Sequence, residues 1–168
     1  MSLRFLLLTF TLLFALPAFA QRFELDDSPS PRQIYSLDLK WGPQDIGRAI
    51  TAMFNGRSSS LPPLTGRLAN VDIRLNTRDF VGQSAKIYLR LPIIQAGTHS
   101  PSNMQLSWRT RGKFLSGNAR PGQSVLVFQG VIEQAITKEV FDFVISIENG
   151  DIPNNFILEP KYEIEVTP

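Results

Sequence analysis

Apolar and polar residues alternate with a period of two through most of this chain. The alternation is clearest between Ala85 and Leu91, where every second side chain is apolar and the residues between are Lys86, Tyr88 and Arg90. This period is typical of a strand with one face in the core and the other in water. It predicts about seven strands, around residues 35–41, 68–75, 85–91, 104–109, 124–132, 140–147 and 156–166.

One segment has helical spacing instead. Between Pro43 and Phe54, apolar residues recur at intervals of three or four, at Ile46, Ile50 and Met53. Proline also suits the first position of a helix. The sequence therefore predicts one short helix near residues 43–54.

Two of the expected strands carry signals about their position in a sheet. Residues 124–132 are apolar on both faces, which favours a central position. Pro160 cannot donate a backbone hydrogen bond, so the last strand is expected at an edge or at a bulge. Glycine and proline between residues 112 and 122 predict a long turn region.

Short strands separated by glycine, proline and asparagine turns are typical of antiparallel sandwiches. No helical segment lies between the later strands, so parallel crossovers are not expected. The fold class predicted is all-β, an antiparallel immunoglobulin-like β-sandwich of about seven strands with one short helix. The chain has no cysteine and so lacks the Cys–Trp–Cys hallmark of antibody domains; the comparison concerns architecture only.

The first twenty residues have the features of a secretory signal peptide. Arg4 precedes the apolar run from Phe5 to Leu16, and the small residues Ala18 and Ala20 follow. We expect cleavage after Ala20 and a periplasmic or extracellular location. Residues 21–33 are polar and are predicted to be a flexible N-terminal arm, and residues 34–168 to be a single β-sandwich domain.

Charge and composition narrow the functional classes. Without residues 1–20, the chain has 16 basic and 15 acidic residues, a net charge of +1 with histidine neutral. So small a net charge indicates no nucleic-acid partner. The absence of cysteine excludes thiol nucleophiles and thiolate metal sites. No cofactor is expected, and no transmembrane segment after the signal is removed.

The residues give little support for catalysis. His99 is the only histidine in the chain and lies in a predicted turn. The chain also lacks the G-x-S-x-G motif that would supply a serine nucleophile for a histidine base. Asp142, between Phe141 and Phe143, is expected to be a hydrogen-bonded structural group. The oxygen-rich turn from Glu148 to Asp151 lacks the spacing of a calcium loop. The chain is therefore predicted not to be an enzyme.

The strongest candidate for a binding surface is formed by two rows of mostly basic side chains. If the strand at 104–109 continues to residue 113, one face presents Arg109, Arg111 and Lys113, and the strand at 85–91 presents Lys86, Tyr88 and Arg90. Neighbouring strands would merge the two rows into a patch able to bind anions. The competing interpretation is a solvated face neutralised by the acidic last strand.

These observations favour an exported, non-catalytic binding module for an anionic glycan, a lipid headgroup or a protein partner. A structural or assembly subunit that donates its N-terminal arm to the next subunit is the first alternative. A hydrolase with an Asp/Glu pair is the second. The oligomeric state is left open by the sequence.

Overall fold

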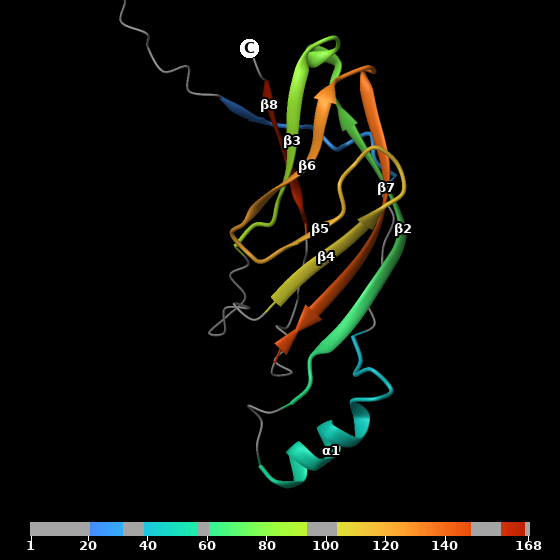
Figure 1. Cartoon of the computed structure of the whole chain (residues 1–168), viewed down its shortest axis with the longest axis vertical. Helices are drawn as coiled ribbons and strands as arrows, with labels where there is room; N and C mark the ends of the chain where they lie inside the picture. The colour runs from blue at the N-terminus through green and yellow to red at the C-terminus, as the bar shows by residue number, and fades with distance from the viewer. Residues whose placement is uncertain (1–20, 32–38, 57–60, 94–103, 149–158, 167–168) are drawn as a thin grey trace, which may run out of the picture.

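The computed structural model describes residues 21–31, 39–56, 61–93, 104–148 and 159–166. These residues form two four-stranded antiparallel sheets and a short helix that lies at one end of the molecule (Figure 1). Several expected features lie outside the described residues: the signal segment 1–20, His99, most of the strand at 35–41 and the turn after Glu148.

The elements follow one another in a simple order. Along the chain they are β1 (Arg22–Glu24), α1 (Ile46–Phe54), β2 (Leu64–Asn76), the 3₁₀ helix η2 (Arg78–Phe80), β3 (Ser84–Arg90), β4 (Met104–Thr110), β5 (Gly117–Ala119), β6 (Ser124–Val131), β7 (Ile136–Ile147) and β8 (Lys161–Val166).

The strands pair as one long hairpin that has been rolled up. β1 pairs with β8, β2 with β7, β3 with β6 and β4 with β5, so each pair is nested inside the previous one. Rolling adds the pairs β3–β8 and β4–β7. The result is sheet I, in the order β1-β8-β3-β6, and sheet II, in the order β2-β7-β4-β5.

This nested order is that of a jelly roll, which has two four-stranded sheets. An immunoglobulin-like sandwich of seven strands would instead place four strands against three. The prediction of a mostly β, antiparallel chain with one short helix is confirmed, whereas the described residues form eight strands in two sheets of four and not about seven. Alternation along a strand assigns faces but not partners, so the sequence could not distinguish the two topologies.

The expected inward faces do form the core between the sheets. In β7, four alternate apolar residues are buried: Phe141, Phe143, Ile145 and Ile147. The Phe141 ring stacks on Phe143 and also contacts Tyr162 of sheet I, with centroids 5.2 Å and 6.3 Å away. The two sheets therefore share one apolar core.

Four predictions about strand positions need correction. β6 is an edge strand of sheet I, and β8 is internal, beginning at Lys161 directly after Pro160. β4 ends at Thr110, so residues 111–113 do not continue it. Residues 117–119, expected within a turn, form the short edge strand β5.

The N-terminal segment also differs from the flexible arm that its composition predicts. Arg22–Glu24 form β1 on the edge of β8, and the following Leu25 is buried. The sequence did not predict this strand, because its side chains are exposed and show no apolar alternation. β1 is held mainly by backbone pairing and ion pairs.

Candidate functional site

The two basic rows lie on different sheets and do not merge. Lys86, Tyr88 and Arg90 are on β3 of sheet I, whose neighbours are β8 and β6. Arg109 is on β4 of sheet II, and Arg111 and Lys113 lie in the connection that follows it. The combined surface predicted from the sequence therefore does not form, because β3 and β4 are not neighbours.

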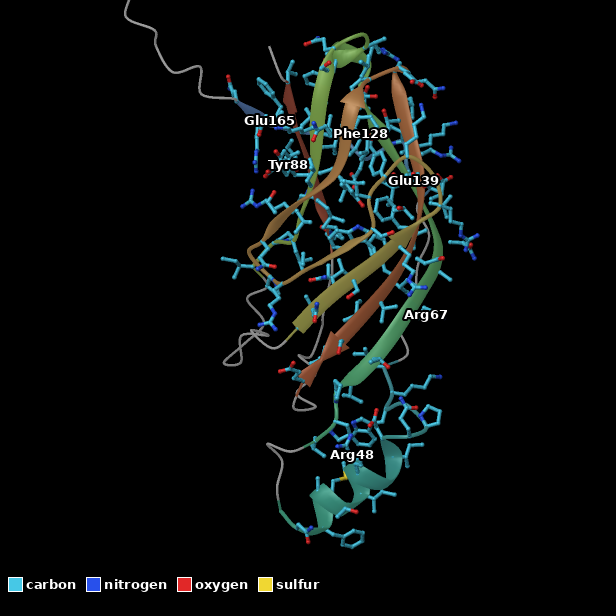
Figure 2. All side chains as sticks on the ribbon, in the orientation of Figure 1. Arg48, Arg67, Tyr88, Phe128, Glu139 and Glu165 are labelled. Atoms are coloured by element: carbon cyan, nitrogen blue, oxygen red, sulfur yellow. The ribbon has the colours of Figure 1, made fainter. Side chains whose placement is uncertain are left out.

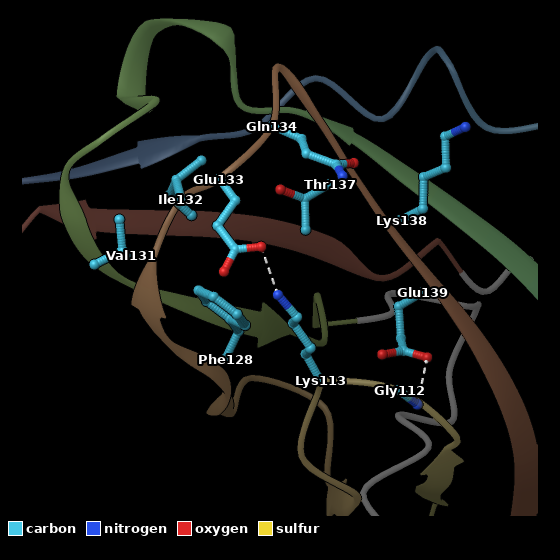
Figure 3. Close-up of a pocket in the computed structure, with 10 residues that line it drawn as sticks. All are labelled: Gly112, Lys113, Phe128, Val131, Ile132, Glu133, Gln134, Thr137, Lys138 and Glu139. Atoms are coloured by element: carbon cyan, nitrogen blue, oxygen red, sulfur yellow. Dashed lines mark hydrogen bonds and ion pairs between the residues drawn. The ribbon is translucent and has the colours of Figure 1, made fainter.

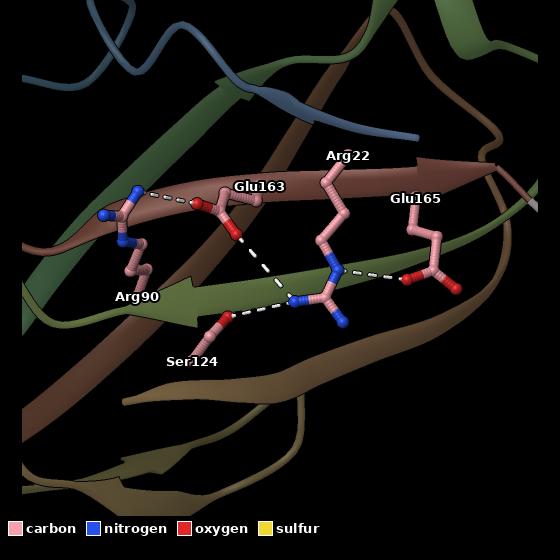
Figure 4. A network of polar contacts seen from close by, with 5 residues as sticks. All are labelled: Arg22, Arg90, Ser124, Glu163 and Glu165. Atoms are coloured by element: carbon pink, nitrogen blue, oxygen red, sulfur yellow. Dashed lines mark hydrogen bonds and ion pairs between the residues drawn. The ribbon is translucent and has the colours of Figure 1, made fainter. Parts of the chain in front are cut away.

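The row on sheet I is neutralised by the acidic strand β8. Arg90 contacts Glu163 at 3.1 Å, and Lys86 lies 4.0 Å from Glu165. Arg22 of β1 donates to Glu165 at 3.1 Å (Figure 4). Its guanidinium also lies 3.7 Å from the centre of the Tyr88 ring. Here the competing interpretation holds, and these cations hold β1 and β3 to β8.

Sheet II carries a different group of cations on its outer face. Arg109 lies opposite Asp142 of β7, and the guanidinium of Arg111 donates to the Asp142 carboxylate at 3.0 Å. Arg67 of β2 pairs in register with Val144, two positions along β7 from Asp142 (Figure 2). We call Arg67, Arg109 and Arg111 the arginine cluster.

The arginine cluster has an excess of positive charge. The three arginines and Asp142 occupy neighbouring positions on or beside sheet II, and of the three only Arg111 contacts the carboxylate, which leaves a local net charge of +2. Arg67 and Arg109 form no ion pair with any residue that the structure describes. Arg109 and Arg111 were predicted from the sequence, but Arg67 was missed because the expected strand began after it.

A bulge in β2 positions the centre of the cluster. The register of β2 with β7 shifts between Leu68 and Val71, and Asn70 adopts a left-handed conformation with φ 57°. The backbone N–H of Asn70 donates to Asp142 at 2.8 Å. This hydrogen bond, and then Arg111, lower the pKa of Asp142. Asp142 is thus the structural carboxylate that its sequence context predicted.

A second carboxylate fixes the connection that carries Arg111. Glu139 is buried and accepts hydrogen bonds from the backbone N–H groups of Gly112 and Phe114, both at 3.0 Å. A Cβ atom on Gly112 would lie 2.6 Å from Glu139 Oε2, so this close approach requires glycine. Glu139 therefore acts as a positioning residue for the loop beside the cluster.

A pocket of about 250 Å³ opens beside this loop (Figure 3). Lys113, which the sequence placed in the basic row, lines this pocket and donates to Glu133 at 2.6 Å. Glu139 and the Phe128 ring also line it. Because Lys113 is paired here, it does not add to the charge of the arginine cluster.

Comparison with models of known families, with curated proteins and with solved structures gives no match. Among the described residues, no three His, Asp or Glu side chains gather closely enough to hold a metal ion. None of their helices is both long and apolar enough to cross a membrane. The only indications of function are therefore the geometry and charge of the described residues.

Proposed function

We propose that this chain is an exported, non-catalytic binding module that holds the anionic groups of an envelope glycan with the arginine cluster. The observation that carries the proposal is that Arg67 and Arg109 flank β7 beside the Arg111–Asp142 ion pair and form no ion pair with any described residue.

Arginine is suited to this role by its shape. The planar guanidinium presents several donors in a fork that matches sulfate, phosphate and carboxylate oxygens. Arg67 and Arg109 project from paired strands of sheet II, so little conformational entropy is lost when a ligand binds. The cations on sheet I are already paired with glutamates, which directs an anionic ligand to sheet II.

Affinity chromatography and titration on heparin, a sulfated polysaccharide, test the proposal with the chain from Gln21 onward. The variant Arg67→Gln/Arg109→Gln is expected to lose affinity by about tenfold or more, since it removes two charge-assisted contacts. The matched control is Lys86→Gln/Arg90→Gln, which removes the same charge from sheet I. Binding by the parent chain should weaken with added salt.

Equal losses in the two variants would refute the proposal, because they would show that only net charge matters. A parallel titration with polygalacturonate distinguishes a carboxylated glycan from a sulfated one. Loss of binding to anionic lipid vesicles in Arg67→Gln/Arg109→Gln would instead assign the cluster to a lipid headgroup. The assembly-subunit alternative requires the N-terminal arm in another subunit, whereas β1 pairs here with β8 of the same chain.

A further inference from the structure

The helix α1 presents large apolar side chains to solvent. Ile46, Ile50, Met53 and Phe54 are 48%, 49%, 55% and 89% exposed. At helical spacing they share one arc of about 100°, while Arg48, Thr51 and Asn55 lie on another side. Only the small side chains Ala49 and Ala52 are buried. The helix thus buries only its small residues and exposes its large ones.

The position of the helix makes this stripe accessible. α1 lies at one end of the long axis, beyond the ends of β2 and β7 (Figure 1). By helical spacing, Arg48 is on the opposite side of the helix from the stripe, and it contacts Asp45 at 3.6 Å. A convex apolar tip of this kind can enter a fluid, flat surface without a complementary groove.

Area and charge favour a lipid bilayer over a second copy of the chain. Four partly exposed side chains present on the order of 500 Å², less than the roughly 800 Å² per partner of a standard protein interface. The described segment from Leu39 to Gly56 has two basic residues and one acidic residue, a local charge of +1. Interfacial helices combine an apolar face with basic residues that attract anionic lipids.

We propose that the segment 39–56 docks on an anionic bilayer, with α1 lying in the interfacial region and its stripe of Ile46, Ile50, Met53 and Phe54 buried among the lipid chains. Trp41, in the same segment, is partly exposed, with its indole Nε1 buried and without a partner among the described residues, and insertion of the stripe brings this ring toward the headgroup level, where indole rings partition well. This surface is separate from the arginine cluster, so neither proposal depends on the other.

Co-sedimentation with vesicles of phosphatidylcholine and phosphatidylglycerol in a 7:3 ratio tests the proposal on the chain from Gln21 onward. The parent chain is expected to sediment, and Ile50→Ser/Phe54→Ser to lose partitioning by on the order of tenfold or more. The matched control is Ile93→Ser. Ile93 is 69% exposed but lies after β3 on the body, so this variant should bind like the parent.

Tryptophan emission gives a second readout. Trp108 is buried in the core, so a blue shift on adding vesicles reports Trp41, and the shift should disappear in Trp41→Phe. The cluster variant Arg67→Gln/Arg109→Gln should keep the shift, and the α1 variant should keep heparin binding. Equal sedimentation of parent and α1 variant overturns the proposal. So does a concentration-dependent dimer, seen by light scattering, that the α1 variant abolishes.

Discussion

At the scale of single residues, Tyr162 is the most unusual member of the core. Its side chain is buried between the sheets against Phe141, and its hydroxyl has no hydrogen-bond partner among the described residues. A buried hydroxyl without a partner costs about 1–3 kcal/mol relative to one that is satisfied. Burial also raises the pKa of the phenol, because the charged form would lose its hydration.

Replacing Tyr162 with phenylalanine should therefore stabilise the protein by about 1 kcal/mol at pH 8. The difference in stability between the variant and the parent should increase at alkaline pH. The unfolded phenol ionises near its ordinary pKa of 10.0 while the buried one stays protonated, so the parent loses stability as the pH rises above 10. The loss from this group is about 1.4 kcal/mol at pH 11, and Tyr162→Phe should lack it.

Urea unfolding at pH 8 and pH 11 measures both effects. Tyr88→Phe is the matched control, because it removes a hydroxyl from the outer face of sheet I and keeps the ring beneath Arg22. A Tyr162→Phe variant that unfolds more easily than the parent at pH 8 would mean that the hydroxyl has a partner.

The residues of the arginine cluster show what the sequence could and could not predict. Alternation with the buried Trp108 correctly predicted that Arg109 faces outward. It failed for Lys113, because the hydroxyl of Thr110 bonds to the Phe114 carbonyl and the chain turns away from the strand. No periodic signal placed Arg67 beside Asp142, since their proximity depends on a pairing between distant segments.

At the scale of elements, bulges explain where the two-residue alternation misled. Val127 and Phe128 are adjacent in β6 and both are buried, because the register with β3 shifts between Ile87 and Tyr88. The carbonyl of Val127 accepts the N–H of Leu115 at 2.7 Å. Residues 124–132 are thus apolar on both faces because of a bulge on an edge strand. In the sequence alone, such a bulge resembles a central strand.

The bulge in β2 leads to a prediction for Asp142→Asn. The lowered pKa of Asp142 means that its carboxylate stabilises the fold above about pH 4 and that this contribution is lost as the pH falls through the folded pKa. The variant should melt at a lower temperature than the parent at pH 7, and the difference should shrink toward pH 2. Scanning calorimetry across this range measures it.

The same variant should bind heparin more tightly, because the charge of the cluster rises from +2 to +3. Glu163→Gln is the control, since it makes the same change in net charge on sheet I beside Arg90. If Glu163→Gln tightens binding as much as Asp142→Asn does, the ligand responds to total charge and the cluster is not its site.

At the scale of the whole molecule, the nested order joins the two ends of the chain. β1 and β8 form the outermost pair, although Arg22 and Glu165 are 143 positions apart in sequence. The acidic residues of β8 lie between cations of β1 and β3, so the predicted neutralisation by the last strand holds for sheet I. Composition could predict that match of charges, whereas the strand order depends on long-range packing.

The outermost pair can be tested by a cysteine bridge between Glu24→Cys and Glu163→Cys. These positions pair in register, and they are a non-hydrogen-bonded pair because the N–H of Leu25 donates to the Tyr162 carbonyl at the next position. Such pairs have Cα atoms about 4.5 Å apart, within the range that a disulfide accepts. The parent chain has no cysteine that could compete.

Oxidation should give a monomer with one internal bridge on a non-reducing gel. The bridge closes a loop of about 140 residues, which in the chain-entropy model stabilises the fold by up to about 5 kcal/mol. The oxidised form should therefore melt well above the reduced form, and Glu24→Cys alone should show no such difference. Disulfide-linked multimers would instead mean that β1 is donated between chains, as an assembly subunit requires, and that the pairing within one chain does not persist in solution.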